Sequence, residues 1–132
     1  MKEFEVQKSE EKWKEELSKE EYHILREAGT ERPGSGKYYK SKADGIYHCA
    51  GCGNPLFDSE HKFDSGSGWP SFYKSAKEGS IVKRPDNSMG TTRTEVLCGK
   101  CGGHLGHVFD DGPDPTGKRF CINSAALDLE KR

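Results

Sequence analysis

Four of the five cysteines form two pairs with the same spacing, Cys49-Ala-Gly-Cys52 and Cys98-Gly-Lys-Cys101. With a glycine in the turn, both sulfur atoms of a pair can face one ion, and two pairs supply the four thiolates of a structural Zn²⁺ site. Residues 53–97 separate the pairs, so the ion would join distant strands. Two disulfides or redox centres are the alternatives, but paired CxxC motifs in a chain of this kind favour a metal.

The expected metal site is closed, and this decides its role. Four thiolates complete a tetrahedral shell and leave no position for a substrate, so we expect a structural rather than a catalytic ion. The composition gives a reason for such an ion, because only 31% of the 132 residues are hydrophobic and 33% are charged. Metal binding can offset a thin core.

The fifth cysteine, Cys121, has no partner close by in the sequence. In an extended run "RFCIN", Arg119, Cys121 and Asn123 share one face, and Phe120 and Ile122 share the other. An arginine beside a thiol favours the thiolate, and an asparagine can donate hydrogen bonds to an oxygen or orient a neighbour. The pattern indicates a reactive thiol. The alternative is a small buried apolar side chain, which free cysteine often is.

Two further motifs contain residue types that take part in chemistry. "GGHLGHVF" places His104 and His107 three residues apart, which in a strand means opposite faces unless Gly106 breaks the strand and brings both rings to one side. Spare zinc ligands and purely structural histidines are the alternatives. In "FDSGSGWPSF", residues 63–72, Trp69 precedes a proline and is biased to an extended conformation. Its ring belongs either to the core or to one wall of a pocket.

The first 30 residues predict two short amphipathic helices, over residues 9–17 and 18–29. Ser9 can cap the first helix. Ser18 and Glu21 form a capping box for the second, and Gly29 suits its C-terminal stop. We expect both helices to pack on the body of the domain.

From residue 45 onward the pattern changes to short extended runs between turn-forming residues. These runs are "IYHCA", "PLFDS", "HKFDS", "SIVKR", "TTRTEVLC", "LGHVFDD" and "RFCINSAALDL", and "GPDPTG" predicts a tight loop before the last. We therefore expect a mainly β (α+β) fold with antiparallel sheets. The chain is expected to be one domain over residues 1–132, with a helical segment at 1–30 and a β core with the zinc site at 31–132.

The charge balance and the terminus exclude some classes of protein. The chain has 21 basic and 22 acidic residues and a net charge of -1, which does not suit a dedicated nucleic-acid binder. It contains no apolar run long enough to cross a bilayer. Its N-terminus has no apolar stretch of the kind found in signal peptides. We expect a cytoplasmic monomer.

From "GTERPGSGKYY" to "CINSAAL" the chain resembles the methionine sulfoxide reductases of the B type. The most specific segments are "FDSGSGWPSF", "CGGHLGHVFDDGPDPTGKRFCINSAAL" and the two CxxC pairs. The resemblance implies two antiparallel sheets with peripheral helices and reduction of methionine (R)-sulfoxide, chiefly in proteins and peptides. Its functional residues match as follows: Cys121 as nucleophile with Arg119 beside it, His104, His107 and Asn123 around the sulfoxide, Trp69 and Phe109 on the substrate, and Cys49, Cys52, Cys98 and Cys101 on one Zn²⁺.

The sequence departs from the family pattern at one position, Ser67. Many members have a cysteine there, which resolves the sulfenic acid of the nucleophile as an internal disulfide. With serine at this position and four cysteines on the metal, we expect an external thiol, thioredoxin or another dithiol, to reduce Cys121.

Two other classes of function are alternatives. A zinc-ribbon-like binding module without catalysis would explain the CxxC pairs but not the setting of Cys121. A zinc hydrolase or deaminase needs an open metal position, which four thiolates deny.

Overall fold

The computed structural model describes residues 4–87 and 90–132. Within these residues it contains two helices, α1 (Glu10–Glu16) and α2 (Lys19–Arg26), two short 3-10 turns, η1 (Ser59–His61) and η2 (Ser124–Ala126), and nine strands. The strands are β1 Gly45–Cys49, β2 Pro55–Asp58, β3 Lys62–Phe63, β4 Ser71–Phe72, β5 Ile81–Asp86, β6 Arg93–Cys98, β7 His104–Phe109, β8 Arg119–Ile122 and β9 Leu127–Lys131. None of the described helices is long and apolar enough to span a bilayer.

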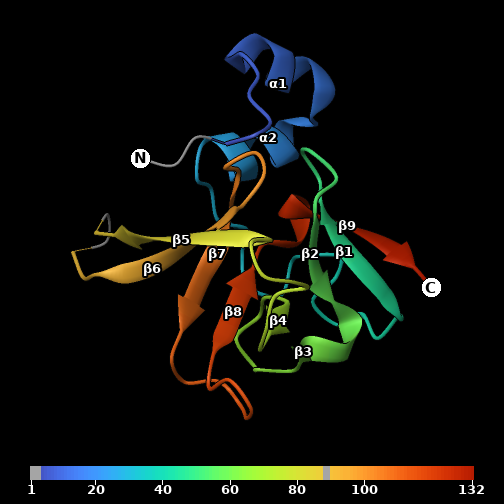
Figure 1. Ribbon diagram of the computed structural model, residues 1–132, viewed down its shortest axis with the longest axis vertical. Helices are drawn as coiled ribbons and strands as arrows, with labels where there is room; N and C mark the ends of the chain where they lie inside the picture. Colours follow the sequence, from blue (N-terminus) through green and yellow to red (C-terminus); the bar gives the residue numbers. More distant parts are fainter. Residues whose placement is uncertain (1–3, 88–89) are drawn as a thin grey trace.

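The strands form two antiparallel sheets, as predicted. The smaller sheet has the order β2-β1-β9 and the larger one β3-β4-β8-β7-β6-β5. Figure 1 shows the small sheet beside the large one, with α1 and α2 together at one end of the molecule. Strand β8 lies inside the large sheet, between β4 and β7, so both of its neighbours constrain it.

Aromatic rings fill the space between the sheets. Phe57 of the small sheet stacks on Phe72 of the large one, with ring centroids 4.5 Å apart. Tyr47 meets Phe72 edge to face at 5.2 Å, and Phe120 lies 5.8 Å from Phe57. All four residues are buried. Large aromatic side chains supply much apolar area per residue, which explains how a chain poor in hydrophobic residues still forms a core.

The helix starts are confirmed, and one helix end is corrected. The Ser9 side chain accepts a hydrogen bond from the Lys12 N–H, and Ser18 and Glu21 form the complete capping box. The second helix ends earlier than predicted, at Arg26, and the residue with left-handed backbone after it is Ala28 (φ 53°), not Gly29. The Gly29 N–H donates to the His23 carbonyl, and its missing side chain leaves room for the His23 ring.

The helices pack over the two CxxC turns. A side chain on Gly51 would touch Trp13, and one on Gly103 would touch Leu25 and the sulfur of Cys101. The Arg26 guanidinium donates to the Cys101 carbonyl at 3.2 Å. The predicted packing of the helical segment on the β domain is therefore confirmed.

The predicted strands are confirmed apart from two differences. Strand β4 lies outside the runs expected to be strands, because two residues are too few to show alternation. The run "RFCINSAALDL" is not one strand: η2 interrupts it, so that β8 belongs to the large sheet and β9 to the small one. Because the chain passes from the large sheet to the small one at η2, the end of β8 lies where the two sheets and α2 meet.

Candidate active site

Cys121 lies in the middle of the large sheet. It pairs with Ser71 of β4 on one side and with His107 of β7 on the other. Its exposed fraction is 9%. Because strands on both sides fix its backbone, the position of its sulfur is determined by the sheet rather than by a loop.

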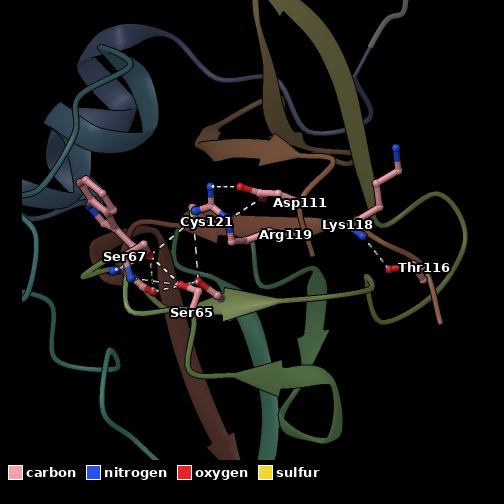
Figure 2. A network of polar contacts seen from close by, with 9 residues as sticks. Ser65, Ser67, Asp111, Thr116, Lys118, Arg119 and Cys121 are labelled. Atoms are coloured by element: carbon pink, nitrogen blue, oxygen red, sulfur yellow. Dashed lines mark hydrogen bonds and ion pairs between the residues drawn. The ribbon is translucent and has the colours of Figure 1, made fainter. Parts of the chain in front are cut away.

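Arg119 holds a positive charge against the sulfur. Its Nη1 donates to Cys121 Sγ at 2.8 Å, and its Nε and Nη2 donate to the two Asp111 carboxylate oxygens at 2.8 and 3.1 Å. Hydrogen bonding to Asp111 raises the pKa of Arg119, and the pKa of Asp111 is lowered in turn. The guanidinium also lies 4.5 Å from the centre of the Phe109 ring. These contacts hold the arginine in place, and Figure 2 shows Arg119 between Asp111 and Cys121.

Serine hydroxyls also lie near the sulfur, and Figure 2 shows Ser65 and Ser67 among them. Ser67 Oγ and Ser71 Oγ lie 3.6 and 3.7 Å from Cys121 Sγ. Ser65 Oγ links them, at 2.8 Å from Ser67 and 2.7 Å from Ser71. Ser71 Oγ also donates to the Trp69 carbonyl at 3.1 Å, so the serine hydroxyls tie the loop that contains Trp69 to the surroundings of the sulfur.

A cleft of about 230 Å³ opens beside Cys121. Six of the predicted catalytic and substrate-binding residues line it, and the lining in full is Thr30, Trp69, Arg93, Gly106, His107, Phe109, Arg119, Cys121 and Asn123. A larger hollow of about 650 Å³ lies between residues 39–44 and 59–64, and its lining contains neither cysteine nor histidine. The cleft beside Cys121 thus contains a thiol that lies outside the four-cysteine cluster.

A β-bulge brings the two histidines together. Val96 pairs with Gly106 and Leu97 with His104, so Leu105 is an extra residue in β7. This shift reverses the alternation of side chains, and the His104 and His107 rings lie 5.6 Å apart. The alternative with both rings on one side is the one observed. His107 lines the cleft, whereas His104 is 4% exposed and lies outside the lining.

A carboxylate binds each histidine. Glu95 Oε2 lies 2.5 Å from His104 Nδ1, and its other oxygen accepts a hydrogen bond from Arg84 at 2.6 Å. Asp86 Oδ2 lies 2.7 Å from His107 Nε2. Burial lowers the pKa of His104, although the hydrogen bond to Glu95 acts in the opposite direction.

Asn123 lines the cleft, but its amide bonds to the backbone. Its Nδ2 donates to the carbonyls of Leu105 at 3.0 Å and Gly29 at 3.4 Å, and its Oδ1 accepts from the Glu31 N–H at 3.0 Å. Both amide protons are thus used. Of the two roles open from the sequence, orienting a neighbour agrees with these bonds.

Several residues at the site are absent from the sequence-based prediction. These are the carboxylates Asp86, Glu95 and Asp111 and the hydroxyls of Ser65 and Ser71. Asp111 belongs to an Asp-Gly dipeptide, which predicts a turn and says nothing of an arginine. Glu95 belongs to the run "TTRTEVLC", which predicts a strand, but an isolated strand does not identify the partner of this side chain.

The four paired cysteines converge at the other end of β6 and β7. Their sulfur atoms all lie within 4.8 Å of one another. Cys49 Sγ and Cys101 Sγ are 3.8 Å apart, and Cys52 Sγ and Cys98 Sγ are 3.6 Å apart. Hydrogen bonding from the neighbouring thiols, Cys101 first, lowers the pKa of Cys98. The cluster joins the β1–β2 turn to the β6–β7 turn.

The backbone around the cluster suits thiolates that bind a metal ion. N–H groups of Gly51, Lys100 and Gly103 donate to the sulfur atoms of Cys49, Cys98 and Cys101, each at 3.4 Å. The turns end at Gly53 and Gly102, which have φ of +80° and +76°, a conformation that favours glycine. Four sulfur ligands of this geometry can hold one metal ion.

Comparisons with known proteins agree with this architecture. The model of the SelR domain matches residues 17–131. The peptide methionine sulfoxide reductase MsrB of Leptospira interrogans is 58% identical over 97% of this chain and 98% of its own length. The proteins of the same name from Bradyrhizobium diazoefficiens and Methanosarcina mazei are 61% and 55% identical, each over 96% of this chain and 91% and 90% of their own lengths. The chain therefore belongs to the MsrB family, the SelR-domain peptide methionine sulfoxide reductases.

Proposed function

We propose that the protein reduces methionine (R)-sulfoxide in proteins and peptides to methionine, with Cys121 as the nucleophile. The observation on which this proposal rests is the Arg119–Cys121 contact of 2.8 Å inside a cleft lined by Trp69, Phe109 and His107. The cleft combines a free thiol with aromatic walls for a methyl group. Family membership supplies the reaction.

The first step transfers oxygen from the substrate to Cys121. The thiolate attacks the sulfoxide sulfur, and a proton from His107 goes to the sulfoxide oxygen, because oxygen leaves poorly without one. The attack forms a bond between the two sulfur atoms, and the protonated oxygen leaves the substrate sulfur. That oxygen then bonds, as hydroxide, to the sulfur of Cys121, the sulfur–sulfur bond breaks, methionine leaves with the bonding electron pair, and Cys121 becomes a sulfenic acid. The sulfur of Cys121 loses two electrons, and the substrate sulfur gains them.

His107 is better placed than His104 to provide this proton. It lines the cleft, and in its protonated form it donates one N–H to Asp86 and has the other for the oxygen. His104 lies behind it and, with Glu95, supports the position of the His107 ring. Arg119 holds the attacking thiolate, and Trp69 and Phe109 contact the methylated sulfur.

The second step requires a thiol from outside the chain. Ser67 has a hydroxyl 3.6 Å from Cys121 Sγ, at the position where many family members have a resolving cysteine, and none of the described residues presents a second thiol to Cys121. Two external thiols, from thioredoxin or a small dithiol, would reduce the sulfenic acid to the thiol, with formation of water and the reductant's disulfide.

Zn²⁺ is the metal that we propose for the four-cysteine cluster. Cys49, Cys52, Cys98 and Cys101 would hold it, and it would supply a covalent link between the two turns. It takes no part in the steps above.

Turnover of the two epimers of a methionine-sulfoxide peptide tests the proposed activity. With dithiothreitol as reductant, we expect reduction of the R epimer alone, because one rigid pocket accepts one epimer of a chiral sulfur. Cys121→Ser is expected to abolish turnover while it leaves the fold intact. Reduction of both epimers, or activity in Cys121→Ser, would contradict the proposal, and a binding module would be indifferent to the substitution.

A further inference from the structure

The segment that leaves α2 lies against the cleft. We call residues 29–34 the strap. Thr30 of the strap lines the cleft, and the Gly34 N–H donates to the Gly68 carbonyl at 2.6 Å. A Cβ on Gly68 would come within 2.6 Å of Pro33, and the φ of +98° at Gly68 also favours glycine. The strap and the loop that contains Trp69 are therefore closely packed.

Glu31 connects the strap to two walls of the cleft. Its carbonyl accepts a hydrogen bond from Trp69 Nε1 at 3.0 Å, and its N–H donates to Asn123 Oδ1 at 3.0 Å. Its carboxylate oxygen Oε1 accepts from the Ala125 N–H at 3.2 Å. One residue thus links the tryptophan loop, the end of β8 and the start of η2.

The carboxylate of Glu31 accepts a hydrogen bond at the start of η2, where the side chain of the N-cap residue usually does so. Asn123 occupies the N-cap position of η2, yet its side chain makes no cap hydrogen bond. The first N–H groups of a helical turn need an acceptor, and Glu31 provides one from far away in the sequence. Because Glu31 provides this acceptor, the Asn123 side chain is available for hydrogen bonds to the main chain of Leu105, Gly29 and Glu31.

The environment of Glu31 indicates a positioned group and not a surface charge. Burial raises its pKa, although hydrogen bonds from residues 124 and 125 act in the opposite direction. No ion pair to a lysine or arginine is present among the described residues. A Cβ on Gly36 would lie 2.2 Å from its Oε2, so the absence of a side chain there makes room for the carboxylate.

We propose that Glu31 is a positioning residue. Its carboxylate anchors residue 31 to the start of η2 through the Ala125 N–H, so that the main-chain carbonyl and N–H of this residue hold the Trp69 ring and the Asn123 side chain in place for binding of the sulfoxide. The kinetic part of this proposal rests on the proposed function. Since Trp69 is expected to contact the substrate methyl group and Glu31 does not touch Cys121 or Arg119, its loss should weaken substrate binding more than the chemical step.

The test compares Glu31→Ala and Glu31→Gln in the full chain, with Glu20→Gln as the matched control. Glu20 is an exposed acid that lines the same hollow as Glu31. For Glu31→Ala we expect KM for the R-sulfoxide peptide to rise about tenfold and kcat to change less than about threefold. Glu31→Gln should keep KM much closer to the wild-type value than Glu31→Ala does, because an amide oxygen still accepts a hydrogen bond from the Ala125 N–H. Glu20→Gln should have the KM and kcat of the wild type.

A spectroscopic readout without substrate separates this proposal from the proposed function. The chain has two tryptophans, so its NMR spectrum has two indole N–H signals. We expect Glu31→Ala to shift the Trp69 signal and accelerate its exchange with solvent, while the Trp13 signal stays unchanged. An unchanged Trp69 signal in folded Glu31→Ala, or an unchanged KM in an active enzyme, would overturn the proposal and leave the proposed function intact.

The wild type provides a further check if Glu31→Ala does not fold. In the wild type the Trp69 indole N–H should exchange slowly, because it is hydrogen-bonded to Glu31. Exchange as fast as that of an exposed indole would overturn the proposal. If the wild type reduces no sulfoxide while its Trp69 indole N–H exchanges slowly, the proposed function is contradicted and the positioning of Trp69 by residue 31 is supported.

Discussion

Cys121 differs from the other four cysteines by its neighbours and not by its burial. Four thiols face one another, and Cys121 instead faces a guanidinium and a set of hydroxyls. The Arg119 guanidinium donates to the sulfur at 2.8 Å, which places a positive charge beside the proposed nucleophile. The sequence predicted the arginine from strand alternation. The serines come from a loop and a short strand, and their approach depends on pairing between distant segments.

Ser67→Cys tests the proposed recycling step. The Ser67 hydroxyl lies 3.6 Å from Cys121 Sγ, so a thiol introduced there would be close enough to attack the sulfenic acid. After one equivalent of R-sulfoxide peptide, we expect an intramolecular disulfide between the introduced thiol and Cys121, detected by mass spectrometry. Ser67→Ala is the control and should form none. An intramolecular disulfide in Ser67→Ala or in the wild type would contradict the need for an external thiol.

His104 should make stability depend on pH. Burial lowers its pKa below the ordinary value of 6.5, so the unfolded chain takes up the proton more readily than the folded one. The free energy of unfolding therefore falls as the pH drops below about 6.5. We expect His104→Gln to lose less stability than the wild type between about pH 7.5 and about pH 5.5, measured by urea unfolding. The exposed His23→Gln is the control, and an equal loss in all three proteins would refute the assignment.

At the scale of elements, the β6–β7–β8 arrangement decides the geometry of the site. The bulge at Leu105 places both histidines on one side, and Gly106 allows β7 to approach β8. A Cβ at Gly106 would lie 2.0 Å from the Cys121 carbonyl oxygen. Gly106 therefore acts through close packing against β8, and it lies within β7 and does not break this strand.

Gly106→Ala is expected to damage both stability and activity. The added methyl group must push β7 away from β8 and displace Cys121, which we expect to cost about 1–3 kcal/mol and to lower kcat/KM by about tenfold or more. Thermal unfolding and steady-state kinetics measure the two effects. Ser18→Ala, which removes a helix cap at about 1 kcal/mol, controls for a general loss of stability. Equal activity in both variants would contradict the packing argument.

Patterns among neighbouring residues predicted most helices and strands correctly, but the sequence contains no pattern that shows which strands pair. The capping box at Ser18 and Glu21 and the strand that became β6 depend on neighbouring residues, and both predictions are confirmed. Strand β4 and the bulge are defined by their partners in the sheet, so a single sequence does not show them. The same reason explains why the sequence alone does not indicate a role for Glu31, whose hydrogen-bond partners are distant in the sequence.

At the scale of the molecule, the four-cysteine cluster connects the two sheets and supports the helices. The convergence of Cys49, Cys52, Cys98 and Cys101 was predicted from spacing, because two identical CxxC turns indicate one ion. The aromatic packing between the sheets was not predicted, since composition gives no contacts. The division into one domain with a helical segment at 1–30 stays a prediction, as does the monomeric state.

Metal removal should therefore unfold the protein. The wild type is expected to contain one zinc ion per chain by elemental analysis. A strong chelator should abolish the near-ultraviolet circular dichroism of the aromatic core, because four unpaired thiolates would repel one another, and added Zn²⁺ should restore it. A chelated protein that keeps its fold but loses activity would contradict the structural role.

A single-turnover experiment tests the central claim most directly, that Cys121 alone exchanges electrons with the substrate. The wild type, reduced and freed of excess thiol, receives an excess of R-sulfoxide peptide without reductant. We predict one methionine formed per chain, loss of one thiol that maps to Cys121, no disulfide, and full recovery on addition of reduced thioredoxin. Two thiols lost per chain, or methionine formation with Cys121 unmodified, would contradict the account.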